Sequence, residues 1–118
     1  MRVFYYGVAT ALLCCAAAIA SPEHAYDGRW TVDFGESDGR CAGAFRDEVT
    51  VTGGKVQYAT KGASGTGHVA PDGAVTGTIL RTDSRVFVTG RLAGNAGGGT
   101  WKAFGNVNCA GRWSAKRG

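Results

Sequence analysis

Residues 49–58 have the sequence VTVTGGKVQY, and this stretch decides the fold. Apolar side chains recur at every second position on both sides of a central glycine pair: Val49, Val51, Val56 and Tyr58. Such alternation is typical of strands with one buried face, and a two-glycine link is typical of a tight hairpin turn. The stretch therefore predicts two antiparallel strands joined at Gly53-Gly54.

The chain on either side repeats this pattern. Apolar residues alternate in WTVDF (residues 30–34), and two valines flank a phenylalanine in VFV (residues 86–88). The predicted connections are Glu36–Gly39 (an acidic loop), Pro71-Asp72-Gly73, Asp83-Ser84 and Gly94–Gly99 (a glycine loop). Glycine in a helix interior costs about 1 kcal/mol relative to alanine. Because the chain holds 20 glycines, no helix longer than a single turn is predicted.

These patterns predict eight strands. They lie near residues 28–34, 41–52, 55–61, 65–70, 74–82, 85–93, 99–105 and 108–116. Short strands joined by consecutive tight turns form an antiparallel meander, and closing the meander removes its sheet edges. The predicted fold class is all-β, an eight-stranded antiparallel up-and-down barrel. A two-sheet β-sandwich is the alternative.

The first 20 residues predict a secretory signal peptide. Arg2 precedes an apolar run, and Ala18-Ile19-Ala20 has the small-x-small pattern of a cleavage site. The run is shorter than the roughly 20 apolar residues that a membrane span needs. Cys14 and Cys15 lie in this run and leave with it. Residues 21–118 then form one β-barrel domain, which we expect to be a secreted or periplasmic monomer without a membrane span.

Two cysteines remain after cleavage, Cys41 and Cys109. An even count in an exported chain predicts a disulfide. The bridge would close a loop of 69 residues and stabilise the fold by roughly 4 kcal/mol on the chain-entropy model. In an eight-stranded meander, the second and eighth strands run in the same direction beside the first. The two cysteines would therefore start these strands at one end of the barrel.

Charge is distributed unevenly along the exported chain. Residues 21–48 hold seven acidic residues, whereas residues 49–118 hold two acidic and nine basic residues. Aromatic residues occur among the basic ones, as on nucleic-acid-binding barrels: Arg81, Arg85, Phe87, Arg91, Lys102, Phe104, Arg112, Trp113, Lys116 and Arg117. An exported protein meets little nucleic acid, so we expect no such partner and regard an anionic glycan or membrane surface as the better fit. The simplest interpretation is a solvated face whose charge the neighbouring first strand balances.

The tryptophans carry the strongest motif. Gly-x-Trp occurs three times, at Gly28–Trp30, Gly99–Trp101 and Gly111–Trp113. Tryptophan buries a large apolar area, so these residues either fill the core of a small barrel or form an aromatic floor for a ligand. The candidate ligand-binding residues are Trp30, Tyr58, Trp101 and Trp113.

Catalytic and metal motifs find little support. His24 falls in an N-terminal segment expected to be flexible, and His68 stands alone in a glycine-rich strand. No nucleophile motif occurs. Asp33, Glu36 and Asp38 do not follow the pattern of a calcium loop. We therefore expect no enzyme activity, no cofactor and no metal site.

Gly28 and Trp30 on the first strand of a meander, followed by a basic last strand, resemble the calycin group: lipocalins, avidins and small bacterial metalloprotease inhibitors. This resemblance implies that Trp30 closes one barrel end. It also implies that a basic side chain of a late strand covers that tryptophan, here Arg112, Lys116 or Arg117. The chain is shorter than a lipocalin or an avidin, and its cysteines lie further apart than we expect in the inhibitors. The resemblance implies binding rather than catalysis.

These observations predict a non-enzymatic binding module for a small apolar ligand inside the barrel or a protein partner at its rim. The alternative is an inhibitor of an extracytoplasmic enzyme such as a protease or lysozyme. Such an inhibitor would act through a mobile segment, either Ser21–Asp27 or Gly94–Gly99. A third hypothesis is a barrel whose side chains fill the interior and leave no room for a ligand.

Overall fold

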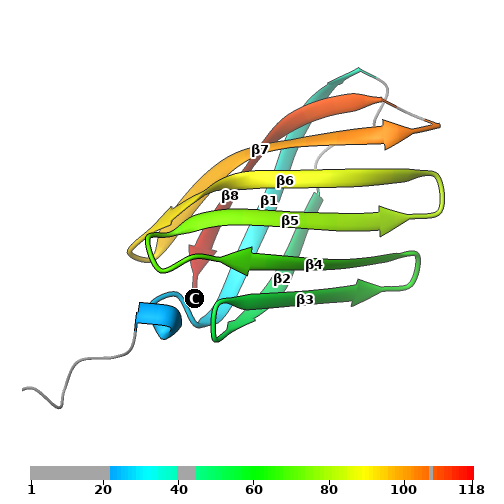
Figure 1. Cartoon of the computed structure of the whole chain (residues 1–118). Coiled ribbons are helices and arrows are strands. Elements are labelled where there is room, and N and C mark those ends of the chain that lie inside the picture. The colour runs from blue at the N-terminus through cyan, green and yellow to red at the C-terminus, as the bar shows by residue number, and fades with distance from the viewer. Residues whose placement is uncertain (1–21, 40–44, 107) are drawn as a thin grey trace, which may run out of the picture.

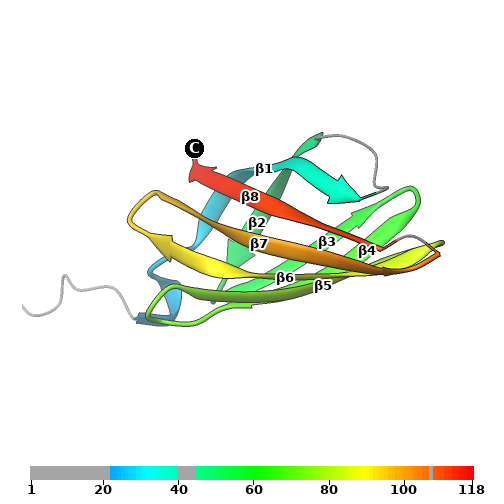
Figure 2. The same cartoon turned by 90° about the horizontal axis from the view of Figure 1, so that it is seen from above.

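The computed structural model describes residues 22–39, 45–106 and 108–118, and within them the chain forms a closed barrel (Figures 1 and 2). A short 3-10 turn, η2 (Pro22–His24), precedes eight strands. The strands are β1 (Gly28–Gly39), β2 (Phe45–Thr52), β3 (Lys55–Thr60), β4 (Ala63–Val69), β5 (Ala74–Arg81), β6 (Ser84–Ala93), β7 (Ala96–Gly105) and β8 (Cys109–Arg117). Each strand pairs antiparallel with the next, and β8 pairs with β1. The up-and-down barrel is thus confirmed, and the sandwich alternative is wrong.

The alternation in the sequence becomes the inside and outside of the barrel. Trp30 and Val32 on β1 and Val51 on β2 belong to the buried core, together with Val86 on β6. The residues between them, such as Arg29 and Thr50, are exposed. Because successive side chains of a strand point to opposite faces, the period-two pattern placed these residues correctly.

Three predicted connections differ from the structure. Glu36–Gly39, predicted as an acidic loop, continues β1, which pairs with β8 after a register shift between Phe34 and Ser37. Most of the predicted glycine loop belongs to β7, and the hairpin turn is confined to Gly94-Asn95 because Gly97, Gly98 and Gly99 all pair with β6. Glycine weakens a strand but does not prevent pairing, which is why the composition was misleading here. The third turn lies at Thr82-Asp83, one residue earlier than predicted.

The N-terminal segment closes one end of the barrel, here called the floor (Figure 1). The Asp27 carboxylate accepts hydrogen bonds from the backbone N–H groups of Gly53 at 2.9 Å and Gly54 at 3.3 Å, in the β2–β3 turn. Tyr26 packs against the core. The prediction of a flexible segment is therefore wrong for Pro22–Asp27, because these contacts bind it to the barrel. Ser21 lies outside the described residues.

The strand pairing has one weak place. β2 and β3 pair over only three residue pairs, from Thr52 with Lys55 to Thr50 with Gln57. By comparison, β6 and β7 pair over ten. Beyond Thr50 the two strands continue without a shared ladder, so the barrel wall has a seam in the half away from the floor.

Several predictions concern residues outside the described part of the chain. The signal peptide (residues 1–20) and Cys41 fall there, so the leader and the disulfide stay predictions. Cys109 begins β8 and pairs in register with Gly39, two residues before Cys41 in the sequence. In the described residues, no helix has the length and hydropathy needed to cross a membrane.

Candidate functional site: a hollow barrel interior

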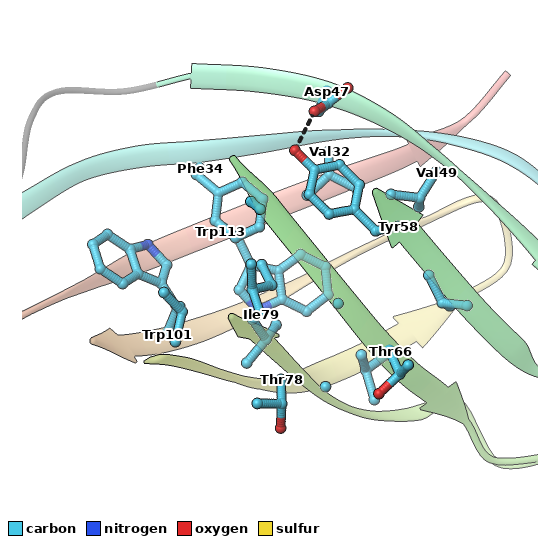
Figure 3. A pocket seen from close by; sticks show the side chains of 18 of the residues that line it. Val32, Phe34, Asp47, Val49, Tyr58, Thr66, Thr78, Ile79, Trp101 and Trp113 are labelled. Atoms are coloured by element: carbon cyan, nitrogen blue, oxygen red, sulfur yellow. Dashed lines mark hydrogen bonds between the residues drawn. The ribbon is translucent and has the colours of Figure 1, made fainter. Parts of the chain in front are cut away.

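The barrel encloses a cavity of about 1030 Å³ that opens at the end opposite the floor. Apolar side chains from all eight strands form most of its wall, so the hypothesis of a filled interior is wrong. All four candidate ligand-binding residues line it: Trp30, Tyr58, Trp101 and Trp113. Figure 3 shows Trp101, Trp113 and Ile79 around this space, and it shows the Tyr58 hydroxyl directed toward Asp47.

Trp30 forms the bottom of the cavity. Its side chain is 2% exposed, and its indole Nε1 donates a hydrogen bond to the carbonyl oxygen of Tyr26 at 2.9 Å. The guanidinium of Arg117 lies 5.1 Å from the centre of its ring. Of the three basic residues proposed to cover this tryptophan, Arg117 is therefore the one in place.

Arg117 also ties the floor together. Its guanidinium donates hydrogen bonds to the backbone carbonyls of Ala25, Asp27 and Gly94 at 2.9–3.1 Å, and to the side-chain oxygen of Asn95 at 2.9 Å. These acceptors belong to the N-terminal segment and to the β6–β7 turn. Because a guanidinium carries five donors in a fixed plane, one side chain can satisfy several carbonyls while its face covers an aromatic ring.

Trp113 and Trp101 each occupy space next to a glycine, where a larger residue would have its Cβ atom. A Cβ atom on Gly90 would come within 2.6 Å of Cζ2 of Trp113, and one on Gly111 within 2.7 Å of the Trp101 ring. Trp113 Nε1 donates to the carbonyl of Thr89 at 2.9 Å. Trp101 Nε1 is buried and has no hydrogen-bond partner in the described part of the chain. The inward-facing glycines therefore let two large rings lie against the barrel wall.

Glycine also explains why the interior is hollow. Gly65 and Gly67 on β4 and Gly77 on β5 line the cavity at positions where the alternation points inward. In an eight-stranded barrel, β4 lies opposite β8, which carries Trp113. At these three positions the wall opposite Trp113 has no side chain, which leaves space in the interior.

Polar residues gather where the cavity opens, here called the mouth. Tyr58 on β3 and Asp47 on β2 are half-buried, and the Tyr58 hydroxyl donates to Oδ2 of Asp47 at 2.5 Å (Figure 3). This bond bridges the seam between β2 and β3. Lys61, Arg81 and Asp83 also line the cavity here.

The Tyr58 hydroxyl is held in its protonated form. Burial raises the pKa of the Tyr58 phenol, and the hydrogen bond to Asp47 raises it further, whereas Thr60 and the Arg81 charge act in the opposite direction. The phenol therefore remains a donor at neutral pH. Arg81 contacts Asp83 only at 4.0 Å and is half exposed, so most of its donors face solvent or the mouth.

The sequence named Arg81 only as part of a basic, solvated face, and it did not point to Asp47. Both could have been placed inside from parity, because Asp47 shares the inward positions of Val49 and Val51, and Arg81 shares that of Ile79. Charged residues are mostly exposed, which is why these two were not predicted to line the interior. The alternation assigned the inward face correctly. It could not show that the strand ends carrying Asp47 and Arg81 lie at the mouth of the cavity.

Three other residues considered in the sequence, His24, His68 and Asp33, have described side chains. His24 Nδ1 lies 2.7 Å from Asp27 Oδ2, and His68 is exposed on β4. Asp33 pairs with Arg46 at 2.7 Å. Within residues 22–39, 45–106 and 108–118, no three His, Cys, Asp or Glu side chains gather as metal ligands would.

Comparison with known proteins gave no match, whether with protein-family models, curated proteins or solved structures.

Proposed function

We propose that the protein binds a small apolar ligand inside the barrel and has no enzymatic role. The observation that carries this proposal is the apolar cavity of about 1030 Å³. Ligand sites in proteins are mostly apolar cavities of roughly 300–1000 Å³ with a few polar groups that fix orientation. The polar groups here lie at the mouth, so the ligand's apolar body would rest on the tryptophans and its polar end would face Tyr58 and Arg81.

The resemblance to calycin-type barrels supports the same proposal. Arg117 over Trp30 is the arrangement that this resemblance implied at the closed end. Export through the predicted signal peptide would place such a carrier outside the cytoplasm. Membership of the group stays part of the proposal.

The segments through which an inhibitor was expected to act are held against the barrel. Pro22–Asp27 is bound to the barrel end, and Gly94 and Asn95 are held by Arg117. Deleting residues 21–27 would also remove Tyr26 and Asp27 from the floor. Such a deletion therefore does not distinguish an inhibitor from a ligand carrier.

A titration with the neutral fluorescent probe N-phenyl-1-naphthylamine tests the proposal. Val88→Trp fills the cavity from β6, whereas Thr89→Trp places the same side chain on the outer face of the adjacent residue. We expect saturable binding to the wild type, at least tenfold weaker binding to Val88→Trp, and binding within twofold for Thr89→Trp. Equal affinities for the two variants would contradict binding inside the barrel.

Native mass spectrometry of protein purified gently from its host identifies the natural occupant. An added mass of a few hundred daltons that is lost on denaturation would support the proposal. A bare mass together with no probe binding would contradict it.

A further inference from the structure

The large apolar side chains left exposed in the described chain lie in the mouth half of the barrel. They are Phe45, Leu80, Phe87 and Phe104, with exposed fractions of 43–51%. Three of them, Leu80, Phe87 and Phe104, lie on the outer faces of the adjacent strands β5, β6 and β7. The rings of Phe87 and Phe104 are 6.0 Å apart between centroids. A contiguous exposed apolar patch of this kind marks an interaction site more often than scattered single residues do.

Basic residues surround this patch. Arg85 pairs in register with both Leu80 and Phe104, and Lys102 pairs with Phe87. Neither Arg85 nor Lys102 forms an ion pair with a described residue. Strands β5 to β8 contain no Asp or Glu at all. The positive charge of strands β5 to β8 is therefore not neutralised by acidic residues within these strands.

Among the described side chains of β1, the one acidic residue pairs elsewhere. Although β1 lies beside β8, Asp33 of β1 pairs with Arg46 of β2. Arg91 on β6 pairs with Asp72 in the β4–β5 turn near the floor, with 3.5 Å between the guanidinium nitrogen and the carboxylate oxygen. Among the described side chains, Arg85 and Lys102 in the mouth half of β5–β7 thus have no acidic partner.

The patch adjoins the entrance of the cavity. Arg81, Asp83 and Ser84 line both the cavity mouth and a shallow hollow beside Leu80, Phe87 and Phe104. A surface that engages this patch would therefore lie next to the opening. Aromatic and aliphatic side chains with unpaired Lys and Arg are the composition of protein surfaces that rest on anionic bilayers.

We propose that the wall formed by Leu80, Arg85, Phe87, Lys102 and Phe104 docks on an anionic lipid bilayer, with the cavity mouth beside the membrane. The apolar side chains enter the headgroup region, and Arg85 and Lys102 contact lipid phosphates. This inference is independent of cavity occupancy, although docking at this place would shorten the path of an apolar ligand between bilayer and barrel.

Vesicle flotation of the full-length exported protein tests the proposal. Vesicles of phosphatidylcholine with one quarter phosphatidylglycerol are compared with pure phosphatidylcholine vesicles. We expect at least tenfold stronger partitioning into the anionic vesicles, which high salt weakens. Phe87→Ser/Phe104→Ser and Arg85→Gln/Lys102→Gln should each lower that partitioning at least tenfold.

The matched control is Lys55→Gln/Lys116→Gln, which removes the same charge from exposed outer positions near the floor. It should retain binding within about threefold. Equal losses in the two charge variants would overturn the proposal in favour of a general charge effect, and so would absence of binding to anionic vesicles. Each variant is also titrated with N-phenyl-1-naphthylamine, because unchanged probe binding separates failure of docking from failure of the barrel.

Discussion

At the scale of single residues, Arg117 has the largest structural role at the floor. Its side chain contacts Trp30, the N-terminal segment and the β6–β7 turn together. Hydrogen bonds from a charged donor are each stronger than neutral ones, and here several of them converge on one side chain. The sequence offered three basic residues for this position, and only the backbone geometry at the end of β8 selects among them.

We predict that Arg117→Ala lowers the free energy of unfolding by about 2 kcal/mol, because several carbonyls lose a charged donor and Trp30 loses its cover. Lysine at this position should not restore stability, since its ammonium cannot present the planar fork. Urea denaturation measures the effect. Arg112→Ala is the control and should change stability by less than about 0.5 kcal/mol. Equal losses for the two variants would show that Arg117 has no special role.

Inward-facing glycines allow a second test at this scale. A Cβ on Gly90 would collide with the carbonyl oxygen of Gly98 and lie 2.6 Å from Trp113, whereas one on Gly77 would have its nearest neighbour at 3.3 Å. We predict that Gly90→Ala lowers the free energy of unfolding by about 3 kcal/mol, as overpacking does. Gly77→Ala, which adds a methyl group to the cavity, should cost less than about 1 kcal/mol. Chemical denaturation of both variants compares them, and similar costs would contradict the packing described for Trp113.

At the scale of elements, the N-terminal segment is held by a pH-dependent link. The hydrogen bond to Asp27 raises the pKa of His24. The backbone N–H of Gly53, followed by His24, lowers the pKa of Asp27. The contribution of His24 is complete below its usual pKa of about 6.5 and is lost as the pH rises through the raised value. That of Asp27 is present above about pH 4 and is lost as the pH falls through the lowered value.

We therefore predict that the Tm difference between the wild type and His24→Gln is largest between about pH 4 and 6.5 and shrinks at higher pH. Thermal unfolding in buffers from pH 4 to 9 measures this. In the background of Asp27→Asn, which lacks the carboxylate, the effect of His24→Gln should no longer depend on pH in this range. A Tm difference that grows above pH 7 would contradict the link.

Most elements could be predicted from the sequence because their patterns are local. The VTVTGGKVQY hairpin forms as expected, since alternation and turn glycines act within a few residues. The register shift after Phe34 could not be predicted, because pairing with β8 determines it. The same holds for Gly97–Gly99, which become strand only through their neighbours on β6 and β8. The docked N-terminal segment depends on Gly53 and Arg117, which are distant in sequence.

At the scale of the whole molecule, the hollow interior was the least predictable property. The sequence identifies which residues face inward, but cavity volume depends on how Trp101 and Trp113 lie across the barrel. Their position follows from Gly111 on β8, next to the strand of Trp101, and from Gly90 on β6, two strands from Trp113. A tryptophan that fills space and one that lines a cavity give the same sequence pattern, so the site could be predicted as a set of residues but not as a space.

The predicted Cys41–Cys109 disulfide is also a property of the whole fold. We predict an intact mass two hydrogens below the reduced value for residues 21–118, the chain left by the predicted cleavage. Reduction should lower the free energy of unfolding by roughly 4 kcal/mol, because it frees a long loop in the unfolded chain. Cys41→Ser/Cys109→Ser should match the reduced wild type in urea denaturation. Two thiols that react freely in the native exported protein would contradict the bridge.

The short ladder between β2 and β3 has a consequence for how easily the barrel opens. Elsewhere, widening the ring would break a run of backbone hydrogen bonds, but along this line the Tyr58–Asp47 bond alone, among the described residues, spans the gap beyond Thr50. Parting the strands there costs on the order of one hydrogen bond. We predict that Tyr58→Phe speeds amide hydrogen exchange in Phe45–Val49 and Tyr58–Thr60 but leaves β6 and β7 unchanged. If the interior holds a ligand as proposed, the barrel would widen along the β2–β3 line while the other seven strand pairs stay intact.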